Sequence, residues 1–100
     1  MERRSENRYR MNEAALLSIP GGSPSRATVL NISPSGCLIE SDMDITPGTE
    51  ILVSLKSIFL ICKARYSRPS AKGTFLIGAS VMRNWPKEEA PVDQLGKSLT

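Results

Sequence analysis

The amino-acid sequence predicts an all-β fold, a six-stranded antiparallel barrel followed by a short C-terminal helix. Three observations lead to this prediction. Short runs of strand-forming residues are separated by turn residues, no long amphipathic helix is expected between them, and the composition is that of a globular protein, with 40% hydrophobic and 23% charged residues. One hundred residues can build one hydrophobic core but not two, so a single domain is expected.

The first half of the chain contains three expected strands, each ended by residues that favour turns. An apolar stretch predicts a strand over 13–19, which ends at the Pro- and Gly-rich turn of 20–24. Alternating residues predict a second strand over 26–32, and the turn at 33–36 leads to a short third strand over 37–40.

The second half contains three more expected strands. In the turn at 46–49, Pro47 fixes φ and Gly48 accepts a positive φ, so a fourth strand follows over 50–55. Two further strands are expected over 58–68 and 73–82. Alternation assigns one face of the fifth strand to Ile58, Leu60, Cys62, Ala64 and Tyr66.

Two features of the last part of the chain complete the expected organisation. Gly78, inside the sixth strand, indicates a bulge or a close approach of another group. Residues 84–89 are typical of a helix start, with Pro86 near the first turn and acidic residues near the positive end of the helix. We therefore expect a flexible arginine-rich arm over 1–11, the β-barrel over 12–83, and a short helix and tail over 84–100.

Charge is concentrated at the start of the chain. The net charge is only +3, but four arginines fall within the first ten residues: Arg3, Arg4, Arg8 and Arg10. Such a cluster is also typical of a solvated basic tail, so charge alone does not define a site. Histidine is absent and no nucleophile has a recognisable base beside it, which argues against Ser-His and Cys-His catalysis and against an enzyme.

The cysteines and the hydropathy pattern lead to two further expectations. Cys37 and Cys62 stand in apolar, strand-like surroundings, so we expect buried reduced thiols rather than a disulfide or a metal site. The longest apolar run, 58–62, is far shorter than the ~18 residues of a membrane span. The arginine-rich start has no secretory apolar segment, so a cytoplasmic location without membrane insertion is expected.

Two short polar signatures suggest an anion-binding site. Arg4 and Arg8 carry planar guanidinium groups four residues apart, and such forks fit phosphate oxygens or a guanine edge. Asn31, Ser33 and Gly36 add a carboxamide, a hydroxyl and an accessible backbone in a tight loop. Asn31 and Ser33 also suit a simple strand-ending turn, in which their side chains bind nearby backbone.

The order and spacing of these signatures, RxxxR followed by [DN]xSxxG, resemble the PilZ domain, a bacterial β-barrel family that binds cyclic di-GMP. The resemblance covers most of the chain. Asn31 stands where many members carry Asp, and Pro34 and Ser35 occupy variable positions of the second motif. The resemblance implies a PilZ-type barrel that acts as a noncatalytic receptor, with no cofactor or metal apart from the ligand cyclic di-GMP.

The resemblance also implies roles for single residues. Arg4 and Arg8 would wrap the phosphates and meet guanine, Asn31 would bind a guanine edge, and Ser33 would meet phosphate or base and brace the loop. Gly36 would let the backbone approach closely. Further candidate contacts are Arg3, which resembles the arginine of members that hold an intercalated ligand dimer, together with Arg10 and Gly78.

Three functions are compatible with these observations. In the first, cyclic di-GMP orders the N-terminal arm and the change is relayed to an unidentified downstream protein. The second is a PilZ-like protein–protein adaptor that binds no nucleotide. The third, a binder of single-stranded nucleic acid, is disfavoured by five aromatic residues and a net charge of +3, which offer few stacking surfaces and little electrostatic attraction.

Overall fold

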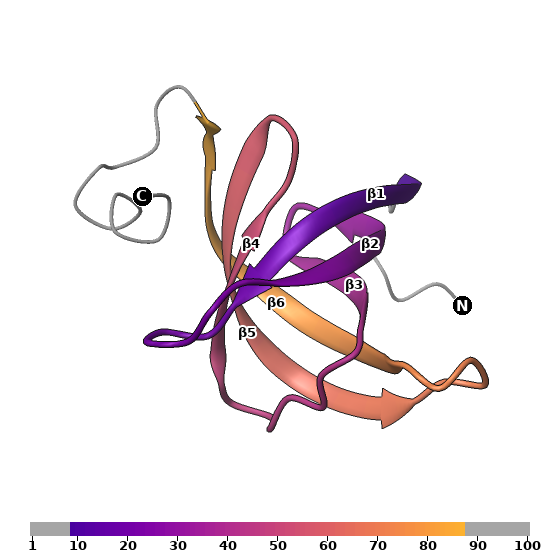
Figure 1. The fold of residues 1–100 in the computed structure, drawn as a ribbon. Coiled ribbons are helices and arrows are strands. Elements are labelled where there is room, and N and C mark those ends of the chain that lie inside the picture. The colour runs from indigo at the N-terminus through magenta and orange to yellow at the C-terminus, as the bar shows by residue number, and fades with distance from the viewer. Residues whose placement is uncertain (1–8, 88–100) are drawn as a thin grey trace, which may run out of the picture.

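The computed structural model describes residues 9–87, which form a closed six-stranded antiparallel barrel (Figure 1). The expected all-β barrel is confirmed. The strands are β1 (Tyr9–Ser18), β2 (Ser25–Ser33), β3 (Gly36–Ser41), β4 (Glu50–Ser54), β5 (Ile58–Pro69) and β6 (Phe75–Pro86). Among the described residues, no helix is long and apolar enough to cross a membrane.

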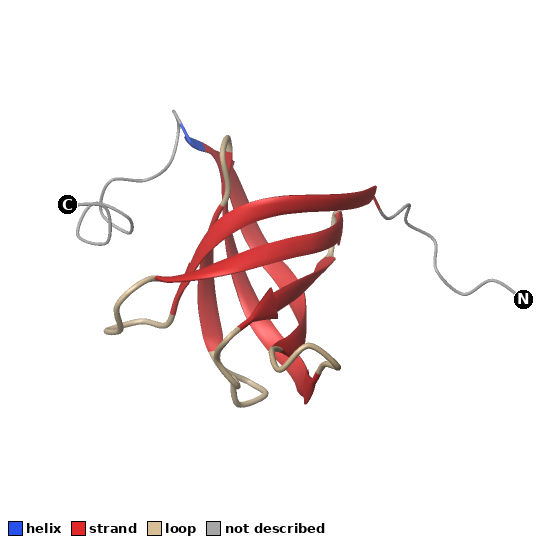
Figure 2. Ribbon diagram, turned by 45° about the vertical axis from the view of Figure 1, so that its right-hand side comes forward, coloured by secondary structure: helices blue, strands red, loops and turns tan. Residues whose placement is uncertain are grey.

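The strands follow one another around the barrel in the order β1-β2-β3-β6-β5-β4. Short hairpins join β1 to β2, β2 to β3, β4 to β5 and β5 to β6, as the turn residues in the sequence favour. The longer connection from β3 to β4 lets β3 pair with β6. A short pairing of β1 with β4 closes the barrel, and Figure 2 shows the strands wrapping around one interior.

The barrel interior is filled by inward-facing aliphatic side chains, as the alternation in the sequence predicts. The largest fully buried side chains are those of Leu17, Ile39, Ile45, Ile51, Leu60, Ile77, Val29, Val53 and Cys62. Burial of apolar surface at ~25 cal/mol per Å² is the main stabilising contribution to such a core.

The two cysteines meet inside this core. Cys37 on β3 and Cys62 on β5 are both buried thiols, and their Sγ atoms lie 4.0 Å apart. The expectation of buried reduced thiols is confirmed.

The turn between the third and fourth strands behaves as its sequence predicts. Gly48 has a φ of 93°, which residues with a side chain rarely adopt. The Thr49 amide donates to the Thr46 carbonyl at 3.1 Å, and the Gly48 amide donates to the Ala64 carbonyl at 2.7 Å. The turn is therefore fixed against β5, next to the segment in which the pairing of β5 with β6 shifts.

That shift overturns one expectation about β5. Ala64 pairs with Ala79 and Tyr66 pairs with Gly78, so Arg65 is an extra residue in the strand. A bulge of this kind changes the face on which the following side chains lie. Tyr66 was expected on the same face as buried Ala64, but it lies on the outer surface and is 43% exposed.

The ends of the described region also differ from expectation. The first strand begins at Tyr9 rather than at residue 13. The expected helix start at Asn84 is wrong, because β6 continues to Pro86, with Trp85 paired with Phe59. The long β5 supplies partners for these residues, and this pairing outweighs the local helix signals. The rest of the expected short helix and tail, residues 88–100, lies outside the described residues.

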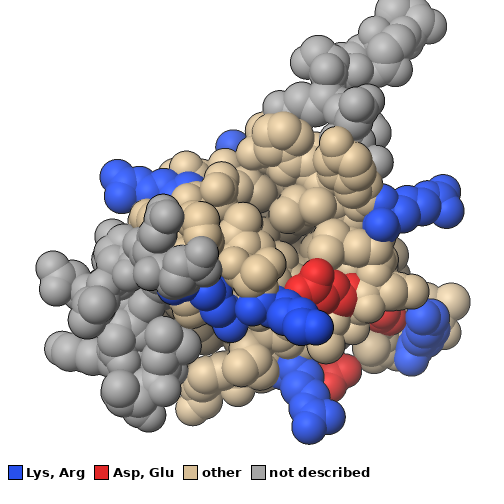
Figure 3. Space-filling view, turned by 90° about the horizontal axis from the view of Figure 1, so that it is seen from above, with Lys and Arg blue, Asp and Glu red and all other residues tan. Residues whose placement is uncertain are grey.

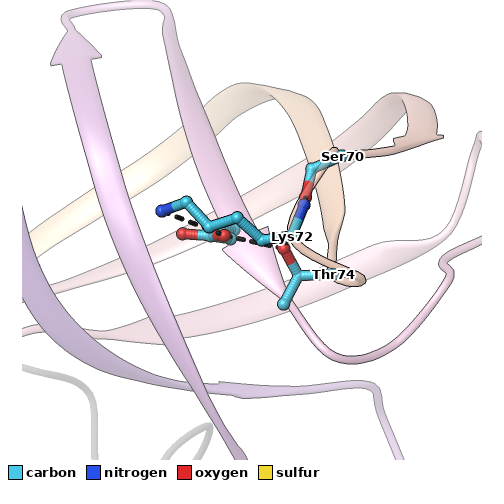
Figure 4. A network of polar contacts seen from close by, with 4 residues as sticks. Ser70, Lys72 and Thr74 are labelled. Carbon is cyan, nitrogen blue, oxygen red and sulfur yellow. Dashed lines mark hydrogen bonds and ion pairs between the residues drawn. The ribbon is translucent and has the colours of Figure 1, made fainter.

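A polar network ties the β5–β6 hairpin to β3 (Figure 4). The Thr74 hydroxyl donates to Glu40 Oε2 at 2.7 Å, and Lys72 Nζ lies 3.8 Å from the same oxygen. Ser70 Oγ lies 2.8 Å from Thr74 Oγ1, and because the single hydroxyl proton of Thr74 goes to Glu40, Ser70 is the donor in this hydrogen bond. Ser70 Oγ also accepts a hydrogen bond from the Lys72 backbone amide. These contacts fix the tip of the β5–β6 hairpin to β3.

Candidate functional site

The second signature forms the end of β2 and the turn into β3. The Ser33 hydroxyl donates to the Gly36 carbonyl at 3.3 Å, and Ser33 is only 5% exposed. The Val81 amide of β6 donates to the Ser35 carbonyl at 2.9 Å, which fixes the turn to a second strand. Ser33 therefore braces the loop as predicted, while its contact with a ligand remains a prediction.

A groove of about 490 Å³ lies on the outer surface beside this turn. Asn31 and Gly36 of the second signature line one side, and residues of β5 and β6 line the other. The strand register explains how they meet, because Gly36 pairs with Ser80 and Leu38 pairs with Gly78, which in turn pairs with Tyr66. Three neighbouring strands, β3, β6 and β5, thus build one continuous wall.

Arg65, Tyr66 and Ser80 are groove residues that the sequence reading did not identify. Arg65 Nε donates to Ser80 Oγ at 2.6 Å, so the guanidinium is held beside β6. Only one signal could have pointed to this wall, namely the glycine at position 78.

Gly78 provides the space that the Tyr66 ring occupies. A Cβ at position 78 would overlap the ring at Cε2 and Cζ and would lie 2.8 Å from Oη. The expected close approach at Gly78 is therefore confirmed, and the group that approaches is a tyrosine ring. The Arg68 guanidinium lies 5.5 Å from the ring centroid, at the margin of a cation–π contact. A contact of Gly78 with a ligand remains a prediction.

Arg10 lies close to the second signature, because its Cα is paired with that of Asn31 across β1 and β2. Arg10 and Asn31 both line a second hollow of about 600 Å³, so Asn31 borders two hollows. The first described residue, Tyr9, pairs with Ile32. The described chain therefore begins directly beside the second signature, whereas Arg3, Arg4 and Arg8 lie outside the described residues.

A larger hollow of about 630 Å³ lies elsewhere on the barrel, and none of the predicted site residues lines it. Its charged residues have both signs: Arg26, Lys56, Lys87, Glu40 and Asp42. We place the candidate site at the smaller groove, since that groove collects the motif residues. Among residues 9–87, no cluster of His, Cys, Asp and Glu is suited to hold a metal ion.

The comparisons with known proteins agree with the motif assignment. A model of the PilZ domain family matches residues 2–95. Among solved structures, the chain is similar to the Bacillus subtilis inhibitor of motility MotI/DgrA, with a TM-score of 0.67 and 15% identity. That similarity covers 96% of this chain and 48% of the other, so the chain spans about half of that protein's length. At 15% identity the likeness concerns the fold alone.

No curated protein sequence is similar enough to count as a match. The family model, however, covers nearly the whole chain, including both arginine positions of the first signature and all of the second. The six-stranded antiparallel barrel agrees with that match. The chain belongs to the PilZ domain family.

Proposed function

We propose that the chain is a noncatalytic receptor for cyclic di-GMP, with the groove beside Asn31 and Gly36 as its binding site. The observation that carries the proposal is the position of β1, whose first described residues pair with the second signature. The chain thus enters the barrel beside the groove, and Arg8 directly precedes that entry in sequence. Arginine forks and a fixed polar turn suit a compact dianion that carries guanine bases.

The proposed relay depends on the arm that contains Arg4 and Arg8. Binding of phosphates by these arginines would restrict the arm, and the charge-assisted hydrogen bonds must outweigh the conformational entropy that is lost. A restricted arm alters the surface available to a downstream protein. Two buried thiols are compatible with a reducing, cytoplasmic location for this receptor.

The charge distribution gives little support to nucleic-acid binding. On the face seen in Figure 3, lysine and arginine side chains project in several directions and acidic side chains lie among them. A groove that follows a nucleic-acid backbone has a continuous positive lining. Tyr9 and Tyr66 are the exposed aromatic side chains among the described residues, which leaves few stacking surfaces.

Substitution of Arg8 tests the assignment of the arm. Arg8→Ala should weaken cyclic di-GMP binding by about 10- to 100-fold, since one charge-assisted contact contributes roughly 1.5–3 kcal/mol. Arg8→Lys should restore only part of the affinity, because an ammonium lacks the fork geometry. The measurement is a calorimetric titration of each variant.

Arg83→Ala is the matched control, because Arg83 is an exposed arginine of β6 that does not line the groove. It should bind as the wild type does. An Arg8→Ala protein that is folded and titrates like the wild type would remove Arg8 from the site.

A further inference from the structure

The bulge in β5 places an arginine in the lining of the groove. Ala64 is fully buried, but the extra residue at this point leaves both Arg65 and Tyr66 exposed on the outer surface. Bulges are common next to binding sites because they redirect side chains in this way. Both residues line the groove across β6 from Asn31 and Gly36.

Two contacts hold this wall in a defined geometry. Arg65 donates from Nε to Ser80 Oγ at 2.6 Å, which restrains the guanidinium beside the groove. The Tyr66 ring lies over Gly78, where any larger residue would displace it. No other hydrogen bond or ion pair joins Arg65 to residues 9–87, so its terminal Nη1 and Nη2 groups remain available.

A guanidinium fork beside a flat aromatic ring suits a purine base better than a phosphate. A phosphate needs charge and donors from several directions, whereas a base presents a flat face and a polar edge. The two terminal amino groups of arginine match the O6 and N7 acceptors of guanine, and adenine has a donor in place of O6. No side chain of β5 belongs to either signature, so a guanine contact from this strand would add to those expected of the signature residues.

We propose that Arg65 binds the O6 and N7 edge of a guanine in the groove, where Tyr66 forms the adjacent part of the groove lining. Ser80 and Gly78 are positioning residues, since they hold the arginine and the ring. This inference rests on the proposed cyclic di-GMP receptor function. It assigns guanine selectivity to the barrel wall, separately from the arginine arm that precedes β1.

Calorimetry with two ligands tests this assignment: cyclic di-GMP, and its 7-deaza analogue, which lacks the N7 acceptor but keeps the phosphates. The wild type should prefer cyclic di-GMP by roughly tenfold or more, the effect of one charge-assisted hydrogen bond. Arg65→Ala should weaken cyclic di-GMP binding by about 10- to 100-fold and should abolish the preference. Arg83→Ala should leave both the affinity and the preference unchanged.

Each contrary outcome has a distinct meaning. If the wild type binds cyclic di-GMP and Arg65→Ala binds it equally well, the receptor function stands and the role of Arg65 is refuted. If Arg65→Ala binds cyclic di-GMP more weakly but still prefers it to the 7-deaza analogue, Arg65 contacts phosphate and the guanine assignment is wrong. If the wild type does not bind cyclic di-GMP, both the receptor function and this inference fail.

Discussion

Cys62 is a thiol that the barrel interior keeps protonated. The hydrogen bond with Cys37, burial away from water and the charge of a neighbouring thiolate all raise the pKa of Cys62 above its ordinary value. The folded state therefore holds a proton that the unfolded chain releases in alkaline solution. The result is a stability that depends on pH in a defined direction.

The free energy of unfolding should be independent of Cys62 ionisation below the ordinary thiol pKa of about 8.5 and should fall above it. The slope from this single group is at most about 1.4 kcal/mol per pH unit. Urea unfolding between pH 7 and pH 9.5 under reducing conditions measures it. Cys62→Ala should have a shallower dependence, and an identical slope in both proteins would show that Cys62 loses no proton on unfolding.

Single residues of the site differ in how well the sequence predicts them. Asn31, Ser33 and Gly36 form a local signature, so their proximity at the end of β2 and the start of β3 follows from chain order alone. Arg65 and Ser80 come from two other strands and meet only because a bulge shifts the register of β5. A strict two-residue alternation predicts Tyr66 on the same face as Ala64, since one extra residue is not visible in an apolar pattern.

At the level of elements, the β5–β6 hairpin depends on a carboxylate of another strand. Glu40→Ala should lower the free energy of unfolding by about 1–2 kcal/mol, because the Thr74 hydroxyl loses a charge-assisted hydrogen bond. Lys72→Ala should change it by less than about 0.5 kcal/mol, because the Lys72 side chain is 77% exposed and exposed ion pairs contribute little.

Urea unfolding of the two variants measures the difference. Lys72→Ala is the matched control, since the Thr74 and Lys72 side chains both contact Glu40 Oε2 and this variant removes only the ion pair. Equal losses for Glu40→Ala and Lys72→Ala would mean that the ion pair, rather than the hydroxyl network, fixes the hairpin to β3.

Element prediction was reliable where turn chemistry and alternation agreed. The six strands and the Gly48 turn follow from these signals. The prediction was wrong where a local signal competed with pairing to a distant strand: Trp85 and Pro86 suggest a helix start, but Phe59 and Ile58 pair with them. The strand order, with β3 next to β6, depends on pairs distant in sequence, and the sequence alone identified only the barrel class.

At the level of the whole molecule, the proposed receptor function predicts that Arg3 affects the number of ligands per chain. An arginine directly before Arg4 offers a second cationic plane, so two molecules of cyclic di-GMP per chain are expected. Arg3→Leu should reduce this number toward one, while the site of Arg4, Arg8, Asn31 and Ser33 keeps its affinity. Calorimetric stoichiometry measures this, and saturation of both proteins at one ligand per chain would remove this role from Arg3.

The most direct test of the central claim is a calorimetric titration of the wild-type chain with cyclic di-GMP, with GMP and cyclic di-AMP as comparisons. The receptor function predicts saturable binding of cyclic di-GMP and much weaker binding of the other two. GMP offers a guanine without the second half of the ligand, and cyclic di-AMP offers the same phosphates without guanine. No heat of binding with cyclic di-GMP, or equal affinity for cyclic di-AMP, would contradict the proposed function.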